Sequence, residues 1–425
     1  MGVGGSGRVA VIGAGAAGLS AAYVLQRRFD VTLFERRERA GGHVHTVRVP
    51  SGPDAGTPVD TGFIVMNQRN YPLLTRLFEQ LGVTLRDSDM SFGYWDQVSG
   101  IQYSGCGAGG VFAQRRNLLR PSFWRMVADI LRFFRAGRRD LASGMPATVS
   151  LGQYLRRGCY SDAFIRHHLV PMGAAIWSTP CDQMLEFPAL SFLRFFENHG
   201  LLSTGSRPQW RTVVGGSDTY VKRLLTGFRG EVRVASPVRS IRRRPDRVEV
   251  TCDGTAAERF DHAVVATHAD EALALLSDPT PDEQRLLGVW RYQLNRAELH
   301  TDTSILPPLR GAWASWNYTR VRGSDPCGPA TLTYDMTRLQ GLTARERYLV
   351  TLNRAPSAPN PRGLVERIDY DHPTYSAAAM DTQSGLRGLN GVGRTYYCGS
   401  YFGYGFHEDA VRSGVEVARL FGLDL

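Results

Sequence analysis

At 425 residues, 43% of them hydrophobic and 21% charged, the chain has the composition of a globular protein with room for about two domains. Its formal net charge of +10 comes almost entirely from arginine, because Lys222 is the only lysine, and it favours an anionic ligand, an acidic partner or a membrane surface. Scattered cysteines without metal-ligand spacing, and apolar runs shorter than the roughly 18 residues of a membrane span, exclude zinc-finger and transmembrane classes; we expect a metal-free cytoplasmic protein without a signal peptide.

The stretch from residue 8 to residue 35 predicts a strand–turn–helix–strand unit that binds a dinucleotide. A strand over 8–12 precedes a Gly-x-Gly-x-x-Gly turn, a helix to about residue 28 and a second strand over 31–34. Gly13 makes the tight turn, Gly15 lets the backbone approach a pyrophosphate, and Gly18 lets the helix pack closely on the strand. The free N–H groups of the helix N-terminus would bind phosphate.

Glu35 supports this interpretation. It follows Gly13 by 22 residues, close to the roughly 20 expected for an acid that accepts hydrogen bonds from ribose hydroxyls. An acid at this position argues against the 2′-phosphate of NADP. The alternative is a Gly/Ala-rich helix that packs closely on a strand without any ligand.

The next 170 or so residues combine helices with aromatic strands. An amphipathic helix is predicted over 67–82, and a strand pair of a substrate domain over 90–103. An amphipathic helix is predicted over 121–141, with an apolar face ringed by arginines and formed by Phe123, Trp124, Val127, Ile130, Leu131 and Phe134. This helix could lie on an acidic membrane, but we favour a cap helix with a solvated basic face. The aromatic region that follows, to about residue 209, predicts the wall of an apolar cavity.

The character of the chain changes at residue 213, where a glycine turn and short strands follow the helical, aromatic region. A Gly-Gly turn at 215–216 leads into a helix over 220–226, a strand over 232–234, a hairpin over 240–252 and a strand over 261–267. The arginine run at 239–247 alternates along the hairpin, so we expect a solvated face and no nucleic acid. Strands over 296–300, 312–317, 331–335 and 348–352 predict an antiparallel substrate sheet.

Two further motifs make a family resemblance specific. Arg39 and a Gly41-Gly42-His43 run follow the acid, and a strand, glycine turn and helix near the C-terminus contain Gly-Phe-His-Glu-Asp at 405–409. With these motifs, essentially the whole chain resembles the flavin-containing amine oxidase superfamily, which includes phytoene desaturases and protoporphyrinogen oxidases. It is most similar to a bacterial subgroup of FAD-dependent oxidoreductases, often associated with enzymes that modify unsaturated fatty acyl chains.

The resemblance implies a Rossmann-type, glutathione-reductase-like α/β domain that binds FAD noncovalently, and an α+β substrate domain built on an antiparallel sheet. The FAD domain would comprise residues 1–88, 209–278 and 391–425, and the substrate domain residues 89–208 and 279–390. The FAD-binding residues would be Gly13, Gly15, Ala16, Ala17, Gly18, Glu35, Arg36, Arg39, Gly41, Gly42, His43, Val238, Ala266, Thr267, Gly399, Ser400, Phe406, His407, Asp409 and Ala410.

Four departures from the family pattern bear on the chemistry. His43 replaces a usual arginine, Ser400 an acid that commonly binds the ribityl chain, and Phe406 a tyrosine of the amine oxidases' aromatic cage. Many amine oxidases also use a lysine near the flavin. Lys222, the only lysine, is predicted on a helix away from the ring, which argues against simple amine oxidation.

We therefore expect FAD-dependent desaturation, saturation or isomerisation at a C–H or C=C bond of a largely apolar small-molecule substrate, such as an unsaturated acyl chain. His407 is the first catalytic candidate, because its ordinary pKa near 6.5 suits proton transfer. Glu408, the second, could cap the helix or orient His407. The alternatives are an amine or amino-acid oxidase that releases hydrogen peroxide, and a non-catalytic flavoprotein at a lipid surface. Peripheral membrane contact would use the 121–141 helix.

Overall fold

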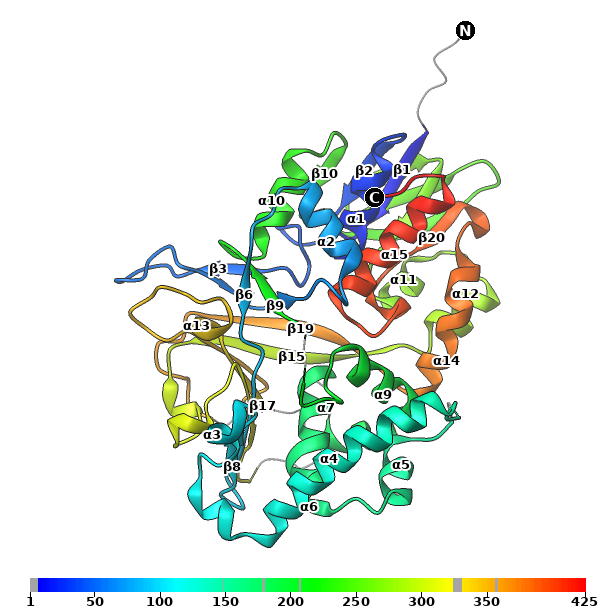
Figure 1. Ribbon diagram of the computed structural model, residues 1–425. Helices are drawn as coiled ribbons and strands as arrows, with labels where there is room; N and C mark the ends of the chain where they lie inside the picture. Colours follow the sequence, from blue (N-terminus) through cyan, green and yellow to red (C-terminus); the bar gives the residue numbers. More distant parts are fainter. Residues whose placement is uncertain (1–6, 147, 178–179, 206–207, 324–330, 356–357) are drawn as a thin grey trace.

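The computed structural model describes residues 7–146, 148–177, 180–205, 208–323, 331–355 and 358–425. One part of the molecule is built on a five-stranded sheet that lies near both chain ends (Figure 1). Its strand pairs are all parallel, and strands 8–12 and 30–34 are almost wholly buried, as expected for a parallel sheet covered on both faces. In sheet order the strands are β10 (Glu231–Arg233), β2 (Asp30–Phe34), β1 (Arg8–Ile12), β14 (His262–Val265) and β20 (Thr395–Tyr397).

Helices α1 (Ala16–Leu25) and α15 (His407–Leu420) lie side by side on this sheet. Glycines permit the close approach: a Cβ atom on Gly18 would collide with the carbonyl oxygen of Gly13, and one on Gly414 with that of Ala17. Both helices follow a strand of the parallel sheet, so both begin at its carboxyl edge. Their N-termini therefore face the same region.

Three small antiparallel sheets and five helices surround the parallel sheet. The sheets are β11 (Val238–Arg243) with β12 (Val248–Cys252) and β13 (Glu258–Phe260); β3 (Thr46–Arg48) with β4 (Pro58–Asp60); and β5 (Val65–Met66) with β9 (Trp210–Val213) and β6 (Leu85–Ser88). The helices are α2 (Pro72–Gln80), α10 (Asp218–Thr226), α11 (Ala269–Leu275), α12 (Pro281–Leu287) and α14 (Ala377–Leu386).

The second part is built on a seven-stranded sheet whose two longest strands, β15 and β19, run across the middle of the molecule (Figure 1). Every neighbouring pair is antiparallel except β16–β7, which is parallel. In sheet order the strands are β19 (Glu366–Thr374), β15 (Arg291–His300), β18 (Leu349–Leu352), β17 (Thr331–Asp335), β16 (Trp316–Arg320), β7 (Phe92–Asp96) and β8 (Gln102–Ser104). The four strands predicted over 296–352 thus pair antiparallel as expected, and the parallel β16–β7 pair joins them to the strand pair predicted over 90–103.

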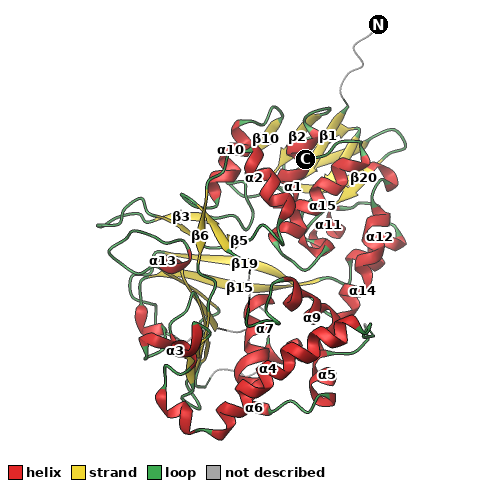
Figure 2. Ribbon diagram, in the orientation of Figure 1, coloured by secondary structure: helices red, strands yellow, loops and turns green. Residues whose placement is uncertain are grey.

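A helical layer packs beside this sheet (Figure 2). It contains α4 (Pro121–Ala142), α5 (Leu151–Arg157), α6 (Asp162–Phe164), a π-helical turn (Ile165–Leu169), α7 (Val170–Trp177), α8 (Cys181–Glu186) and α9 (Ala189–Asn198). Fully buried phenylalanines at 123, 133, 164, 192 and 196 form the core between these helices. Shorter helices are α3 (Gly107–Val111) and α13 (Met336–Leu339).

Helix α4 has the predicted span and most of the predicted apolar face. Phe123, Val127, Ile130 and Phe134 pack on the core, whereas Trp124 and Leu131, at the edges of that face, are exposed among the arginines. The inward face includes a buried acid, Asp129, whose carboxylate accepts the backbone N–H of Ser161 at 2.9 Å.

One predicted strand is too long, and one strand of the seven-stranded sheet was not predicted. The predicted strand over 312–317 begins only at Trp316, because the Asn317 side chain accepts the backbone N–H of Ala314 at 2.9 Å and holds 314–317 in a turn. Strand β19 was not predicted, since it contains Pro373 and several acids, which are depleted in strands. It forms because it pairs with β15 over nine residues.

Within the described part of the chain, no helix is long and apolar enough to cross a membrane. The same residues contain no group of three or more His, Cys, Asp or Glu side chains placed to hold a metal ion.

The α1–α15 contact makes a prediction about stability. Gly414→Ala should lower the free energy of unfolding by about 1–3 kcal/mol or more, because the new methyl group meets the Ala17 carbonyl in a packed interface. Gly388→Ala is the matched control, since a Cβ atom there meets nothing within 4 Å. Denaturant unfolding of both variants checks this; equal stabilities would contradict the packing argument.

Candidate functional site

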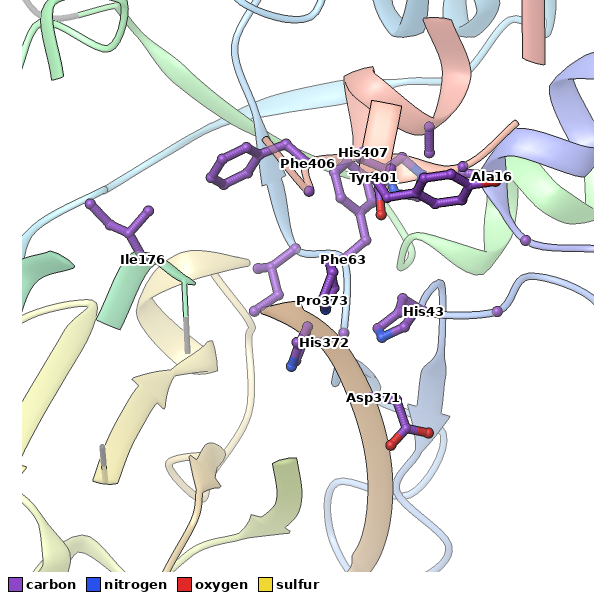
Figure 3. Close-up of a pocket in the computed structure, with 18 of the residues that line it drawn as sticks. Ala16, His43, Phe63, Ile176, Asp371, His372, Pro373, Tyr401, Phe406 and His407 are labelled. Carbon is purple, nitrogen blue, oxygen red and sulfur yellow. The ribbon is translucent and has the colours of Figure 1, made fainter. Parts of the chain in front are cut away.

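One long cavity of about 1010 Å³ runs from the carboxyl edge of the parallel sheet to the helical layer (Figure 3). Its walls come from both parts of the molecule. We call the end near Glu35 the nucleotide end, and the end lined by Phe133, Phe164 and Ile176 the apolar arm. A cavity of this size lies at the upper end of the range for ligand-binding pockets.

The nucleotide end is shaped by backbone rather than by side chains. Gly13 has a φ of +101°, and a Cβ atom there would lie 2.8 Å from the carbonyl oxygen of Ala266, so the turn needs glycine. A Cβ atom on Gly15 would instead meet nothing within 4 Å and would fill cavity space. No side chain caps the N-terminus of α1, so its first N–H groups are available to a ligand phosphate.

Glu35 lies at the end of β2 and lines the cavity. Its carboxylate accepts the backbone N–H groups of Ala14 and Arg37, each at 2.9 Å. These bonds fix the acid beside the glycine turn, where its remaining lone pairs can accept ribose hydroxyls.

The predicted FAD-binding residues come together at this cavity, and all of them line it except Gly18, Arg39 and Asp409. Gly18 packs under the turn, as described above. The Arg39 guanidinium donates to the carbonyls of Gly42 at 3.0 Å and Val44 at 2.9 Å, so it supports the Gly41–Gly42 loop from behind. Asp409 accepts the backbone N–H groups of Tyr404 and Phe406 and so holds the start of α15.

His43 carries the clearest sign of an absent ligand group. Its Nε2 atom is buried with no hydrogen-bond partner among the described residues, and its ring stacks on Tyr370 with centroids 5.1 Å apart. Burial, and then the neighbouring His372 and His268, hold its pKa well below the ordinary value. The ring is therefore neutral. An orphaned polar atom beside an open phosphate cradle fits a bound dinucleotide such as FAD.

His407 is the first residue of α15 and lines the cavity. One of its ring nitrogens is in hydrogen-bond contact, and the face of its ring is stacked on another aromatic ring. Its Nε2 lies 2.7 Å from the hydroxyl of Tyr220, and its ring stacks on Phe63 at 4.0 Å. Burial lowers its pKa to about 3, so the ring stays neutral at physiological pH. A catalytic role for His407 stays a prediction; this environment favours positioning of the helix N-terminus over proton transfer.

Glu408 does not line the cavity. Its carboxylate accepts the backbone N–H groups of Leu73 at 3.0 Å and Leu74 at 2.9 Å and so caps α2. Burial raises its pKa to about 7, against the opposing effect of these hydrogen bonds. Of the two roles considered for Glu408, helix capping is the one its contacts show, although the helix is α2 rather than its own.

His372, on β19, was missed by sequence reasoning. It lines the cavity near His43, on the opposite side from Phe406 and Tyr401 in Figure 3. Its Nδ1 accepts from the Nδ2 of Asn295 at 2.8 Å, and the Asn295 amide is itself oriented by Asn353, whose Nδ2 donates to its Oδ1 at 2.8 Å. The ring proton therefore sits on Nε2. Burial lowers the His372 pKa to about 4.

Aromatic rings line the passage from this region into the apolar arm. Phe406 stacks on Phe195 at 4.9 Å, Phe195 on His199 at 3.9 Å, and Trp316 meets Tyr334 edge-on at 5.0 Å. The expected apolar cavity wall between residues 121 and 209 is thus present. The prediction for Lys222 is confirmed: it lies on the exposed side of α10, paired with Asp218, and away from the cavity.

Comparison with known proteins agrees with this geometry. The sequence profile of the family "Flavin containing amine oxidoreductase" matches residues 16–324. The "Putative flavin-containing monoamine oxidase AofH" of Mycobacterium tuberculosis is 26% identical over 347 residues, which cover 77% of this chain and 70% of that protein.

Three solved structures share the fold across nearly their whole length. Cyclohexylamine oxidase from Brevibacterium oxydans has a TM-score of 0.71 and 16% identity, with 98% of each chain covered. The CLA-producing fatty acid isomerase from P. acnes has a TM-score of 0.70 and 15% identity, with 99% and 100% covered. Putrescine oxidase bound to putrescine has a TM-score of 0.67 and 17% identity, with 98% of each covered. The predicted fold class is confirmed.

The open space at Gly15 leads to a test of cofactor binding. Gly15→Val should fold but lose most bound FAD, because its side chain would occupy the phosphate cradle without touching protein. The flavin absorbance of purified protein, together with its melting temperature, checks this. Gly109→Val, at another open glycine outside the cavity, should stay yellow; a fully loaded Gly15→Val variant would contradict the assignment.

The buried His407 predicts a pH dependence of stability. Its pKa is about 3 in the fold and about 6.5 in an unfolded chain. Below pH 6.5 the unfolded chain therefore binds a proton that the folded protein does not, and stability falls as the pH drops from about 6.5 towards 3. His407→Asn should reduce this slope by about 1.4 kcal/mol per pH unit. Denaturant titrations at pH 7, 6 and 5 check this; identical slopes would refute it.

Proposed function

This chain belongs to the flavin-containing amine oxidoreductase family and is an FAD-dependent oxidoreductase, and we propose that it acts on C–H or C=C bonds of a largely apolar substrate such as an unsaturated acyl chain. The reaction would be a desaturation, a saturation or an isomerisation. FAD, when bound, supplies the exchange of a hydride with a substrate carbon. Such substrates reside in bilayers, so we also propose peripheral contact with a membrane.

The lining of the apolar arm carries this proposal. Phenylalanines at 133, 134, 164, 195 and 196, with Leu169, Met172 and Ile176, would desolvate a hydrocarbon chain, and each buried CH₂ group is worth about 0.8 kcal/mol. The carboxylates among the described lining residues lie outside the apolar arm. Glu35 and Glu271 are at the nucleotide end. Asp89 pairs with Arg338, and Asp371 follows Tyr370 on β19.

The chain's own groups suggest how the substrate is held. Phe406 and Phe195 would contact the acyl chain where the arm meets the start of α15. The N-terminus of α15 places positive potential at the same point, which stabilises negative charge on a bound group. His372 would meet a ligand through its Nε2–H, since its Nδ1 is occupied by Asn295. We propose that His372 donates this hydrogen bond to the bound ligand and that His407 positions α15.

The second candidate is an amine or amino-acid oxidase. Two observations favour it: amine oxidases are among the structures with the same fold, and Asp371 lines the cavity and could pair with an ammonium group. The position of the only lysine, on the far side of α10, argues against it.

Anaerobic mixing of the FAD-loaded protein with unsaturated fatty acids, and separately with amines, tests the two candidates. Bleaching of the flavin by fatty acids, or an isomerised fatty acid without net bleaching, is the expected result. Product analysis by gas chromatography distinguishes the redox-neutral case. Bleaching by amines alone, with hydrogen peroxide released in air, would replace the proposal with the second candidate.

His372→Asn tests this hydrogen bond. Loss of one donor to charge that develops during the reaction lowers kcat by about 10²–10³, and FAD content should stay unchanged. His300→Asn is the matched control, because His300 is buried in the same sheet, bonded to Thr351, and does not line the cavity. If both variants turn over like the parent protein, His372 has no role in the reaction.

A further inference from the structure

We propose that one corner of the molecule docks on an anionic lipid bilayer, and that the acyl chain enters the cavity from there. The docking corner consists of the β7–β8 turn (97–100), the 3₁₀ turn Arg115–Leu119, the first turn of α4 and the 3₁₀ turn Arg310–Ala312. The entry route rests on the proposed function, because it assumes an acyl substrate; the docking surface itself does not.

Exposed apolar side chains concentrate at this corner. Leu119 is 85% exposed, Val98 55%, Trp124 47%, Leu118 45% and Leu309 38%. They are five of the eleven large apolar side chains exposed in the described chain, and they come from four segments, three of them within residues 97–124 and the fourth near residue 309. Such clustering marks an interaction surface, whereas single exposed leucines do not.

The four segments are held together by hydrogen bonds. Arg116 donates from Nη2 to the carbonyl of Gly100 at 2.8 Å, and the Nε1–H of Trp124 donates to the carbonyl of Leu118 at 2.9 Å. The backbone N–H of Leu309 donates to the side chain of Gln102 at 2.9 Å. Figure 1 shows α3, β8 and the first turns of α4 together at the end of the molecule away from the parallel sheet. The corner is thus a preformed surface.

The charge around the corner is of one sign. Residues 97–128 contain four arginines and no aspartate or glutamate, and residues 303–323 contain three arginines and likewise no acid. Two of these seven arginines, Arg125 and Arg320, pair with the buried Asp129 and Asp96. Leucine and tryptophan surrounded by arginine match the interface of an anionic bilayer, where the apolar side chains enter the acyl boundary and the cations meet headgroup phosphates. Because the exposed apolar side chains and the arginines match these two layers of a bilayer interface, we infer that the partner of this corner is an anionic lipid surface.

The arginines further along α4 are engaged within the protein. Arg132 pairs with Asp129 and stacks on Tyr160, and Arg138 pairs with Glu197. Arg139 pairs with its neighbour Asp140. The membrane contact expected along the whole 121–141 helix is therefore confined to the N-terminal turn and the segments beside it.

The elements of the corner also line the apolar arm. Phe133 and Phe134 on α4, and Tyr103 on β8, face the cavity. Gly105, directly after β8, is exposed and also lines the cavity, so the cavity wall reaches the surface at the end of the β7–β8 hairpin opposite the 97–100 turn. A chain that leaves the bilayer at this corner meets apolar side chains along its path.

Vesicle sedimentation of the FAD-loaded protein tests the docking surface without turnover. The parent protein should sediment with phosphatidylglycerol-containing vesicles, not with pure phosphatidylcholine, and should be released by salt. The double variant Leu118→Glu/Leu119→Glu, and separately Arg115→Glu/Arg116→Glu, should bind at least about tenfold more weakly. Leu420→Glu is the matched control, because Leu420 is 60% exposed on α15 and outside the corner.

The outcomes separate this proposal from the proposed function. Equal binding of the parent and both double variants, or no binding to any vesicle, would overturn the docking surface. Binding of an acidic protein in place of vesicles would overturn it in favour of a protein interface. Detergent-dispersed fatty acids reach the cavity without docking on a bilayer. If the parent protein does not turn them over, the proposed function is refuted and the docking surface is unaffected. The variant Gly105→Leu tests the entry route. If it binds vesicles like the parent protein but turns over bilayer-lodged acyl chains more slowly, the entry route is supported. Unchanged turnover overturns the entry route.

Discussion

The close approach of α1 to β1 and to α15 is the constraint on which the site depends. Gly18 allows the first contact and Gly414 the second, because any Cβ atom at either position would collide with a backbone carbonyl. This packing brings two helix N-termini, about 390 residues apart in the sequence, to one edge of one sheet. The uncapped N–H groups of one helix and the positive end of the other then face the same cavity. Without both glycines, the ends of the chain could not build one cofactor site.

The two parts of the molecule are joined by buried polar contacts around Asp60 and Tyr370. Asp60 accepts from Thr46, Ser217 and Gln340, and burial raises its pKa to about 7. The hydroxyl of Tyr370, on β19, lies 2.8 Å from that of Thr61, and its ring supports His43. Contacts of this kind are costly to leave unsatisfied, so they set the position of the seven-stranded sheet relative to the nucleotide end.

Three histidine rings that line the cavity near the predicted flavin site are neutral. The pKa values of His43, His372 and His407 are all lowered, chiefly by burial, and the only lysine is remote. A neutral aromatic environment suits a substrate that is recognised by its hydrocarbon surface. The positive charge of the chain is instead placed on the exterior, where an arginine-rich, apolar corner adjoins the same cavity.

The sequence by itself determined the parallel unit that begins the chain, the glycine turn with Glu35 and the FAD assignment, and all but three of the residues that it predicted for the FAD site line the cavity. These follow from local rules, since glycine spacing and strand–helix order act over short segments. The division into domain segments remains a proposal from the sequence. Only the tertiary structure decided the contacts of Glu408 and His372 and which residues of α4 face outward. Each depends on a partner distant in sequence: Leu73 for Glu408, Asn295 for His372 and Ser161 for the buried acid of α4. Burial and partners of this kind are set by packing, which no local pattern encodes.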